Sequence, residues 1–175
     1  METTTAYIPA LKYRSLTRFY DWLIATFLQE RRWKNHLIDS FAERQPATIL
    51  DIGSGTGTLA LMMSEKFPTA NIHGLDGDSE IIQLAAEKIA DSKAMNIALT
   101  KGLSFNLPFA DGTFDVVTSS LMLHHLSKID KHRTMKEVYR VLRPSGTLAI
   151  ADWGKPSSKL VRVLFYSVQF LDGFE

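Results

Sequence analysis

The ten residues TILDIGSGTG, numbered 48–57, join a short apolar run to a loop rich in glycine. Thr48–Ile52 has the composition of a buried strand, and Thr58–Lys66 shows the apolar spacing of a helix. Three glycines fall within five residues, at Gly53, Gly55 and Gly57. Glycine permits positive φ and lets a ligand approach the backbone, and three in alternation exceed what a turn requires. The stretch therefore predicts a strand, a ligand-binding loop and a helix, in that order.

Downstream of this loop, strand-like runs alternate with helical patterns. The predicted helices are Ser79–Ala90, with Ser79 as N-cap, and Asp130–Leu142. The predicted strands are Asn71–Leu75, Ile97–Thr100, Phe114–Ser119 and Thr147–Ala151. Strands separated by helices pair in parallel through right-handed crossovers. We therefore predict an α/β fold built on a parallel sheet. Further helical segments are expected within residues 14–45 and over residues 156–171.

Composition excludes several classes of protein. The chain has 175 residues, no cysteine and a net charge of +1, with 45% hydrophobic and 22% charged residues. The absence of cysteine excludes disulfide scaffolds, cysteine zinc sites and thiol nucleophiles. The near-zero charge gives no electrostatic reason to expect nucleic acid as a partner. No run reaches the roughly 20 apolar residues of a membrane span and no secretory signal opens the chain, so we expect a soluble, cytoplasmic protein.

An acidic residue follows the second predicted strand. Asp76 stands about 20 residues after the loop, where a carboxylate can accept hydrogen bonds from both hydroxyls of a ribose. Asp76 could instead begin the next helix, although Asp78 or Ser79 can fill that role. The last glycine of the dinucleotide fingerprint Gly-x-Gly-x-x-Gly is replaced here by Thr58. This replacement disfavours a nicotinamide-dependent oxidoreductase.

The segments DIGSGTG (51–57) and GLDGD (74–78) resemble the first two motifs of class I S-adenosylmethionine-dependent methyltransferases. Later segments resemble the same family: LPFADGTFDVV (107–117), LHHL (123–126) and EVYRVLRPSG (137–146). The likeness is greatest to small-molecule methyltransferases of ubiquinone and menaquinone biosynthesis. It implies a Rossmann-like, doubly wound, mostly parallel sheet and S-adenosylmethionine as cofactor. It also implies in-line SN2 transfer of a methyl group to a small, hydrophobic or aromatic acceptor.

The resemblance also implies a cofactor site. Asp76 would hold the ribose, Gly77 would lie beside the adenine, and Asp51 would bind the amino group. Ser119 would face the sulfonium, and Tyr13 belongs to an N-terminal segment that would cover the pocket. The residues expected to bind the cofactor are Tyr13, Asp51, Gly53, Ser54, Gly55, Gly57, Asp76, Gly77, Gly102, Leu103, Ser104 and Ser119. No metal site is expected.

The sequence departs from the family at two places. The family has Gly-Asp after the third strand, whereas this chain has Gly102-Leu103, so backbone groups of Leu103 and Ser104 would have to pair with the adenine. The family also has a C-terminal strand hairpin that is lacking here, which would leave Thr147–Ala151 as an open edge. We expect a truncated chain, or pairing into a homo-oligomer through that edge. A non-catalytic cofactor-binding or scaffold subunit is the alternative function.

Two adjacent histidines, His124 and His125, follow the fourth strand near the expected acceptor. Imidazole is a base near neutral pH, so either could remove a proton from the acceptor. Alternatively, one packs under the cofactor while the other faces solvent or caps a helix. Asp152 and Trp153 could line the acceptor pocket or serve packing, whereas Asp115 begins a strand and is expected to be structural.

The chain is divided in our prediction into an N-terminal helical segment and a cofactor-binding domain. Residues 1–46 would form a lid or substrate segment, because basic and aromatic residues alternate through 11–36. That pattern also occurs on nucleic-acid surfaces, but the net charge of +1 favours the lid. Residues 47–175 would form the S-adenosylmethionine-binding domain.

Overall fold

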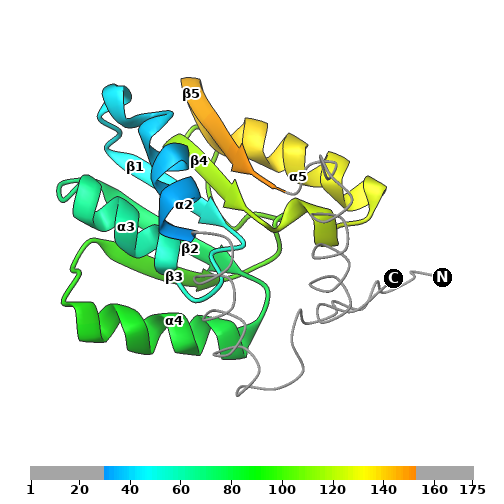
Figure 1. The fold of residues 1–175 in the computed structure, drawn as a ribbon. Coiled ribbons are helices and arrows are strands. Elements are labelled where there is room, and N and C mark those ends of the chain that lie inside the picture. The colour runs from blue at the N-terminus through cyan, green and yellow to red at the C-terminus, as the bar shows by residue number, and fades with distance from the viewer. Residues whose placement is uncertain (1–29, 153–175) are drawn as a thin grey trace, which may run out of the picture.

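The computed structural model describes residues 30–152 (Figure 1). Its strands are β1 (Thr48–Ile52), β2 (Asn71–Asp76), β3 (Ile97–Lys101), β4 (Phe114–Ser120) and β5 (Leu142–Ala151). Its α-helices are α2 (Glu30–Asp39), α3 (Thr58–Lys66), α4 (Ser79–Ser92) and α5 (Lys128–Val141). Two short 3-10 turns, η1 (Ala42–Arg44) and η2 (Leu123–His125), complete the described elements.

The five strands form one sheet in the order β3-β2-β1-β4-β5, and every pairing between neighbours is parallel. The strand order reverses at β1, which pairs with β2 on one side and β4 on the other. This is the point at which open α/β sheets bind ligands beyond the carboxyl ends of their strands. The predicted α/β, doubly wound fold is confirmed.

Helices α2 and α3 cover one face of the sheet (Figure 1). Leu37, Ile38 and Phe41 from the α2 segment pack with Ile49 of β1 and Ala149 of β5. The stripe arises because residues three and four apart share one side of a helix. The described part of the predicted N-terminal segment, residues 30–46, therefore contributes to the same core as the sheet.

Helix α5 covers the other face. Val138 and Val141 pack against Leu50 and Ile52 of β1 and Val117 of β4. Since side chains alternate along a strand, Ile49 and Leu50 enter opposite clusters. This alternation fixes the direction of every functional side chain on β1 and β4.

Several predicted boundaries need correction. The N-cap of α4 is Asp78 rather than Ser79, because the Asp78 carboxylate accepts from the backbone N–H groups of Glu80 and Ile81. Strand β5 begins at Leu142 rather than at the predicted Thr147. Its pairing with β4 is irregular between the Phe114–Leu142 pair and the Val116–Thr147 pair. Of the helical region expected over 14–45, residues 14–29 lie outside the described residues, as does the helix expected over 156–171.

The edge strand β5 pairs only with β4 among the described residues. Ile150 on this strand has 42% of its surface exposed. Within residues 30–152, the helices are all too short or too polar to cross a bilayer.

Candidate functional site

The predicted site residues gather where the chain leaves the carboxyl ends of β1, β2 and β4. Asp51 lies near the end of β1 and Ser119 near the end of β4. The two strands pair in parallel, and Ser119 directly follows Thr118, the residue that pairs with Asp51. Asp76 is the last residue of β2. The loop of residues 53–57 passes between these tips and leads into α3, whose N-cap is Gly57. The tertiary structure thus brings together residues that are far apart in the sequence.

The Asp76 carboxylate is held by backbone donors on both oxygens. Its Oδ2 accepts from the Gly55 N–H at 3.0 Å, and its Oδ1 accepts from the Asp78 N–H at 3.0 Å. Burial raises the pKa of the Asp76 carboxyl, while these backbone bonds oppose that shift. A carboxylate has about four acceptor positions, so capacity remains for further donors such as ribose hydroxyls.

Two glycines of the loop differ in what lies next to them. A Cβ on Gly53 would come within 2.4 Å of Met122 Cγ, so this glycine is needed for packing against the segment after β4. A Cβ on Gly55 would meet no atom of residues 30–152 within 4 Å, although its φ is +54°. Gly55 therefore presents bare backbone to open space, which suits a ligand lying against the loop.

Asp51 is fully buried on the face of the sheet that α2 and α3 cover. Its Oδ1 accepts from Thr118 Oγ1 at 2.9 Å, across the β1–β4 pair. Burial raises the pKa of the Asp51 carboxyl to about 7, although the Thr118 hydrogen bond and the positive charge of Lys34 oppose the shift. The nearby Asp76 carboxyl raises it further.

Three buried polar atoms at these strand tips have no hydrogen-bond partner within the described part of the chain: Asp51 Oδ2, Ser54 Oγ and Ser119 Oγ. Buried polar atoms are normally paired, and exceptions call for an explanation. S-adenosylmethionine carries an ammonium, ribose hydroxyls and a positive sulfonium, all of which suit these oxygen acceptors. The residues at the site therefore fit this cofactor.

The segment after β3 is engaged within the protein. Ser104 Oγ lies 2.9 Å from Thr134 Oγ1 of α5, and the Leu103 carbonyl accepts from the Asn106 N–H at 3.0 Å. A Cβ on Gly102 would come within 2.9 Å of Leu75 Cδ1. The predicted backbone contacts of Leu103 and Ser104 with adenine stay a prediction, as does the contact of Gly77.

His124 is joined to the end of β5. Its Nδ1 lies 2.7 Å from Asp152 Oδ1, and its backbone N–H donates to Asp152 Oδ2 at 3.1 Å. The rings of His124 and His125 lie 4.0 Å apart. Leu121, just before this turn, has a φ of +51°, a strained value of the kind that gathers at functional sites. The histidines therefore stand at the same edge as the glycine loop.

Other predicted residues lie elsewhere. Tyr13 and Trp153 are outside the described residues. Asp115, at the opposite edge of the sheet, accepts from the backbone N–H groups of Ala47 and Thr48 and pairs with Arg143. Its carboxylate therefore joins the start of β1 to β4, as a structural residue does. Among residues 30–152, no group of three metal-ligating side chains is found.

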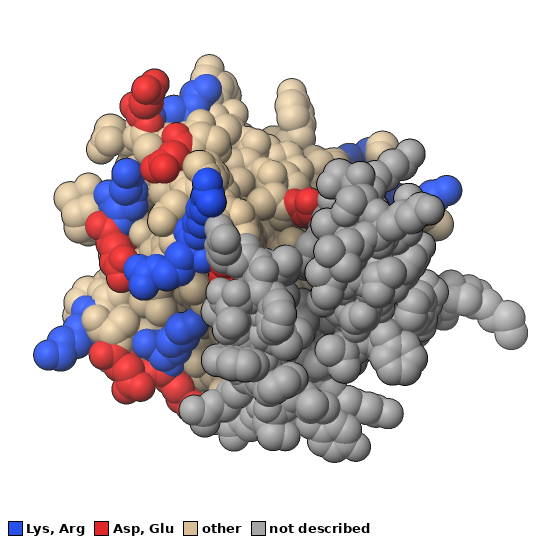
Figure 2. Space-filling model, viewed as in Figure 1, with Lys and Arg blue, Asp and Glu red and all other residues tan. Residues whose placement is uncertain are grey.

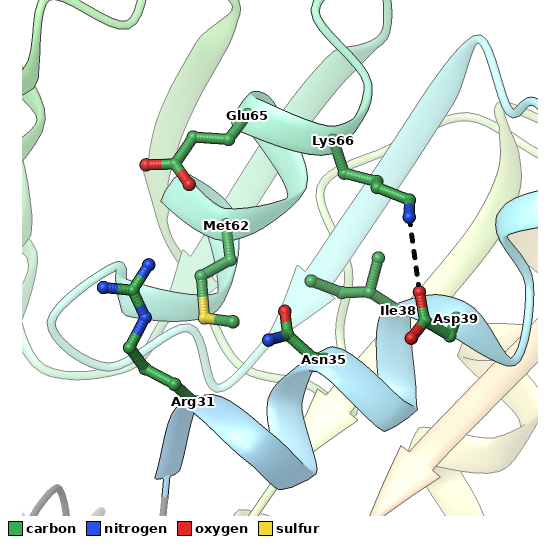
Figure 3. Close-up of a pocket in the computed structure, with 7 residues that line it drawn as sticks. All are labelled: Arg31, Asn35, Ile38, Asp39, Met62, Glu65 and Lys66. Carbon is green, nitrogen blue, oxygen red and sulfur yellow. Dashed lines mark hydrogen bonds and ion pairs between the residues drawn. The ribbon is translucent and has the colours of Figure 1, made fainter.

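A separate hollow of about 210 Å³ lies between α2 and α3 (Figure 3). It is lined by Arg31, Asn35, Ile38, Asp39, Met62, Glu65 and Lys66. Lys66 Nζ pairs with Asp39 Oδ1 at 3.4 Å. None of the predicted site residues lines it. On the described surface in Figure 2, basic and acidic side chains are interspersed, without a broad field of one sign.

The methyltransferase domain family matches residues 49–146, which include the glycine loop, both strand-tip aspartates and the two histidines. The chain belongs to this family. Among proteins of known sequence, the chain is similar to a demethylmenaquinone methyltransferase from Thermus thermophilus, 33% identical over 86% of this chain and 68% of that protein. A ubiquinone/menaquinone biosynthesis C-methyltransferase from Geotalea daltonii is 30% identical over 84% of this chain and 63% of its own length.

Among solved structures, the methyltransferase domain resembles an S-adenosylmethionine-dependent methyltransferase from Aquifex aeolicus. The TM-score is 0.60 with 27% identity, over 65% of this chain and 60% of that one. The chain thus belongs to the class I S-adenosylmethionine-dependent methyltransferase family and is similar to its ubiquinone/menaquinone type, as predicted. It spans about two thirds of the length of the curated relatives it matches. The relatives are named as enzymes, and nothing in them supports the scaffold alternative.

Sequence reasoning missed two residues that shape this site. The hydroxyl of Thr118 donates a hydrogen bond to Asp51. The sequence offers one indication of this residue, because Thr118 lies one position before the predicted Ser119 on the same strand. Met122 packs against Gly53, and no local pattern points to it because the contact joins distant segments.

Proposed function

We propose that this chain binds S-adenosylmethionine at the carboxyl edge of its sheet and methylates a small, flat acceptor of the quinone type. The observation that supports cofactor binding is at Gly55, where a side chain would meet no described atom within 4 Å and the backbone N–H donates to Asp76. The names of the relatives refer to demethylmenaquinone and to ubiquinone/menaquinone biosynthesis, and they support a quinone-type methyl acceptor.

S-adenosylmethionine, when bound, supplies an electrophilic methyl group on a sulfonium, which an acceptor can attack in line with the departing sulfur. In this proposal Asp76 accepts from the ribose hydroxyls, and Asp51 in its ionised form accepts from the amino group. The oxygens of Ser54 and Ser119 provide further acceptors at the strand tips. The protein thus binds and orients the donor through groups that the fold has already placed.

His124 is the proposed base for an acceptor that must lose a proton. Asp152 contacts Nδ1 of His124 and its backbone N–H, so the carboxylate fixes the orientation of the ring. A carboxylate at one ring nitrogen also favours the protonated imidazole that forms when a base accepts a proton. His125 packs beside this ring and is the second candidate.

Calorimetric titration with S-adenosylhomocysteine tests the cofactor half. Saturable binding is expected, with NADH as a ligand that does not bind. Incubation with labelled S-adenosylmethionine and a short-chain demethylmenaquinone tests the acceptor half, with transfer of label into the organic phase as the expected result. Absence of binding at millimolar S-adenosylhomocysteine would refute the proposal.

A further inference from the structure

Helix α5 has a solvent-facing side on which every charged residue is basic. Thr134, Val138 and Val141 are buried and fix the opposite side of the helix against the sheet. The exposed residues recur three or four positions apart, so they share one face of the helix. They are Lys128, Ile129, His132, Arg133, Lys136 and Tyr139, and together they form what we call the α5 face.

The two carboxylates of α5 lie at the flanks of this face and are engaged elsewhere. Glu137 accepts from the Leu107 backbone N–H and from Arg140. Asp130 accepts from the Ser127 hydroxyl and lies 3.5 Å from Nη1 of Arg133. Within residues 30–152, no carboxylate pairs with Lys128 or Lys136. The ammonium groups of both lysines are therefore available to a negatively charged partner.

The absence of exposed acidic side chains distinguishes α5 from the other helices of the described part of the chain. Asp39 is exposed on α2, Glu65 on α3 and Glu80 on α4. Helix α5 covers the face of the sheet opposite α2 and α3 (Figure 1). The net charge of +1 therefore conceals a local basic surface on one side of the domain.

Two large apolar side chains are exposed on the α5 face. Ile129 has 67% of its surface exposed and Tyr139 has 86%. They are separated by about 15 Å along the helix, because each residue adds about 1.5 Å. Tyrosine suits the boundary between lipid head groups and hydrocarbon, since its ring is apolar and its hydroxyl is polar. Basic residues interspersed with exposed apolar ones are typical of surfaces that bind anionic bilayers.

We propose that the α5 face docks onto the surface of a bilayer that contains anionic phospholipids. Lys128, Arg133 and Lys136 lie against the lipid phosphates, while Ile129 and Tyr139 enter the head-group region. The low net charge of the chain does not oppose this contact, because salt screens charges beyond about 8 Å. A nucleic acid is a less suitable partner, since single strands are bound by successive aromatic rings and this face has one.

The α5 face begins beside the proposed acceptor site. Helix α5 starts at Lys128, three residues after the exposed His125 of η2, and Ser127 is its N-cap. An apolar methyl acceptor partitions into a bilayer, so a protein docked through α5 meets that acceptor next to the two histidines. This consequence rests on the proposed function, whereas the docking itself rests on the charge and exposure of α5.

The test is co-sedimentation of the 175-residue chain with lipid vesicles. The chain should bind vesicles made of equal parts phosphatidylcholine and phosphatidylglycerol, and should not bind phosphatidylcholine alone. Raising the salt from about 0.1 M to about 1 M should release most of the protein, because the screening length falls from about 10 Å to about 3 Å. Combining Lys128→Gln with Lys136→Gln should weaken binding tenfold or more, since each basic residue near an anionic bilayer contributes about fivefold.

The matched control combines Arg31→Gln with Lys66→Gln, which removes the same charge from exposed residues of α2 and α3. It should change vesicle binding less than threefold. Combining Lys128→Arg with Lys136→Arg should retain binding. Ile129→Gln should weaken binding at both salt concentrations, because the contact that it removes is apolar.

Failure of the unmodified chain to bind the anionic vesicles would overturn the inference. Equal losses in the two glutamine double variants would also overturn it, because net charge rather than the α5 face would then decide binding. Tighter binding of a short duplex DNA through the same lysines would replace the bilayer with a nucleic acid. Calorimetry with S-adenosylhomocysteine should give the same affinity for all these variants. Its failure with the unmodified chain would refute the proposed function and leave the vesicle result standing.

Discussion

The backbone N–H of Gly55 donates a hydrogen bond to Asp76 Oδ2 at 3.0 Å, joining the middle of the glycine loop to the end of the neighbouring strand. The bond fixes the loop before any ligand arrives. A preformed site loses less conformational entropy on binding than a loop that must first be ordered.

Replacing Asp76 with alanine should weaken S-adenosylhomocysteine binding tenfold or more. Hydrogen bonds to a charged acceptor contribute about 1.5–3 kcal/mol each, and the variant loses those to the ribose as well as the bond to Gly55. Calorimetry measures the change. Asp78→Ala is the matched control, because it removes a helix cap and lowers stability by about 1 kcal/mol without removing a ligand contact. Equal affinity in the Asp76 and Asp78 variants would contradict the assignment.

Gly55→Ala should abolish most cofactor binding while lowering stability only modestly. A new Cβ there meets no atom of the described part of the chain within 4 Å, but it would occupy the space assigned to the ligand. Gly112→Ala is a close control, since Gly112 has a φ of +59° against +54° for Gly55 and also has open space around it. Both variants should lose about 1–2 kcal/mol of unfolding free energy from backbone strain. Only the Gly55 variant should lose affinity.

The stability of the ligand-free protein should depend on pH through Asp51. The pKa of this carboxyl is raised from 3.8 to about 7 by burial, so the folded state holds a proton that the unfolded chain releases. Stability contributed by this group is therefore full below about pH 4 and declines as pH rises toward 7. Asp51→Asn should remove the decline, so that the variant gains melting temperature relative to the native chain between pH 5 and 8. A constant difference over that range would show that Asp51 is ionised when folded.

The same residue should couple cofactor binding to pH. Binding of an ammonium requires ionised Asp51, so affinity for S-adenosylmethionine should rise with pH up to about 7 and then level off. Titrations in buffers of different ionisation enthalpy should reveal proton release on binding below pH 7. Asp51→Asn should bind weakly at every pH.

Arg140→Met should lower the free energy of unfolding by about 1–3 kcal/mol, because several charge-assisted hydrogen bonds are lost together. Arg140 binds the carbonyls of Leu107 and Phe109 and the carboxylates of Asp111 and Glu137, and so ties the segment before β4 to α5. Urea denaturation measures the loss. Arg133→Met provides the comparison, since Arg133 contacts Asp130 at 3.5 Å on an exposed face and should contribute less than 1 kcal/mol.

The alternation of strands and helices could be predicted from the sequence because it depends on local periodicity. Thr48–Ile52 and Thr58–Lys66 have the boundaries that their apolar spacing predicted. The N-cap of α4 was misplaced by one residue, since aspartate and serine stand side by side and both can cap a helix. Such a choice depends on the backbone angles at the turn rather than on residue type.

The sequence by itself determined the fold class, the position of the glycine loop and the position of Asp76 at the end of its strand. Each depends on residues close together in the chain. Only the tertiary structure placed Thr118 against Asp51, Asp152 against His124, and the buried Lys34 on the same face of the sheet as Asp51. These relationships depend on strand register and on how a helix lies over the sheet. Both result from burial of apolar surface across the whole domain, which no local pattern of residues encodes.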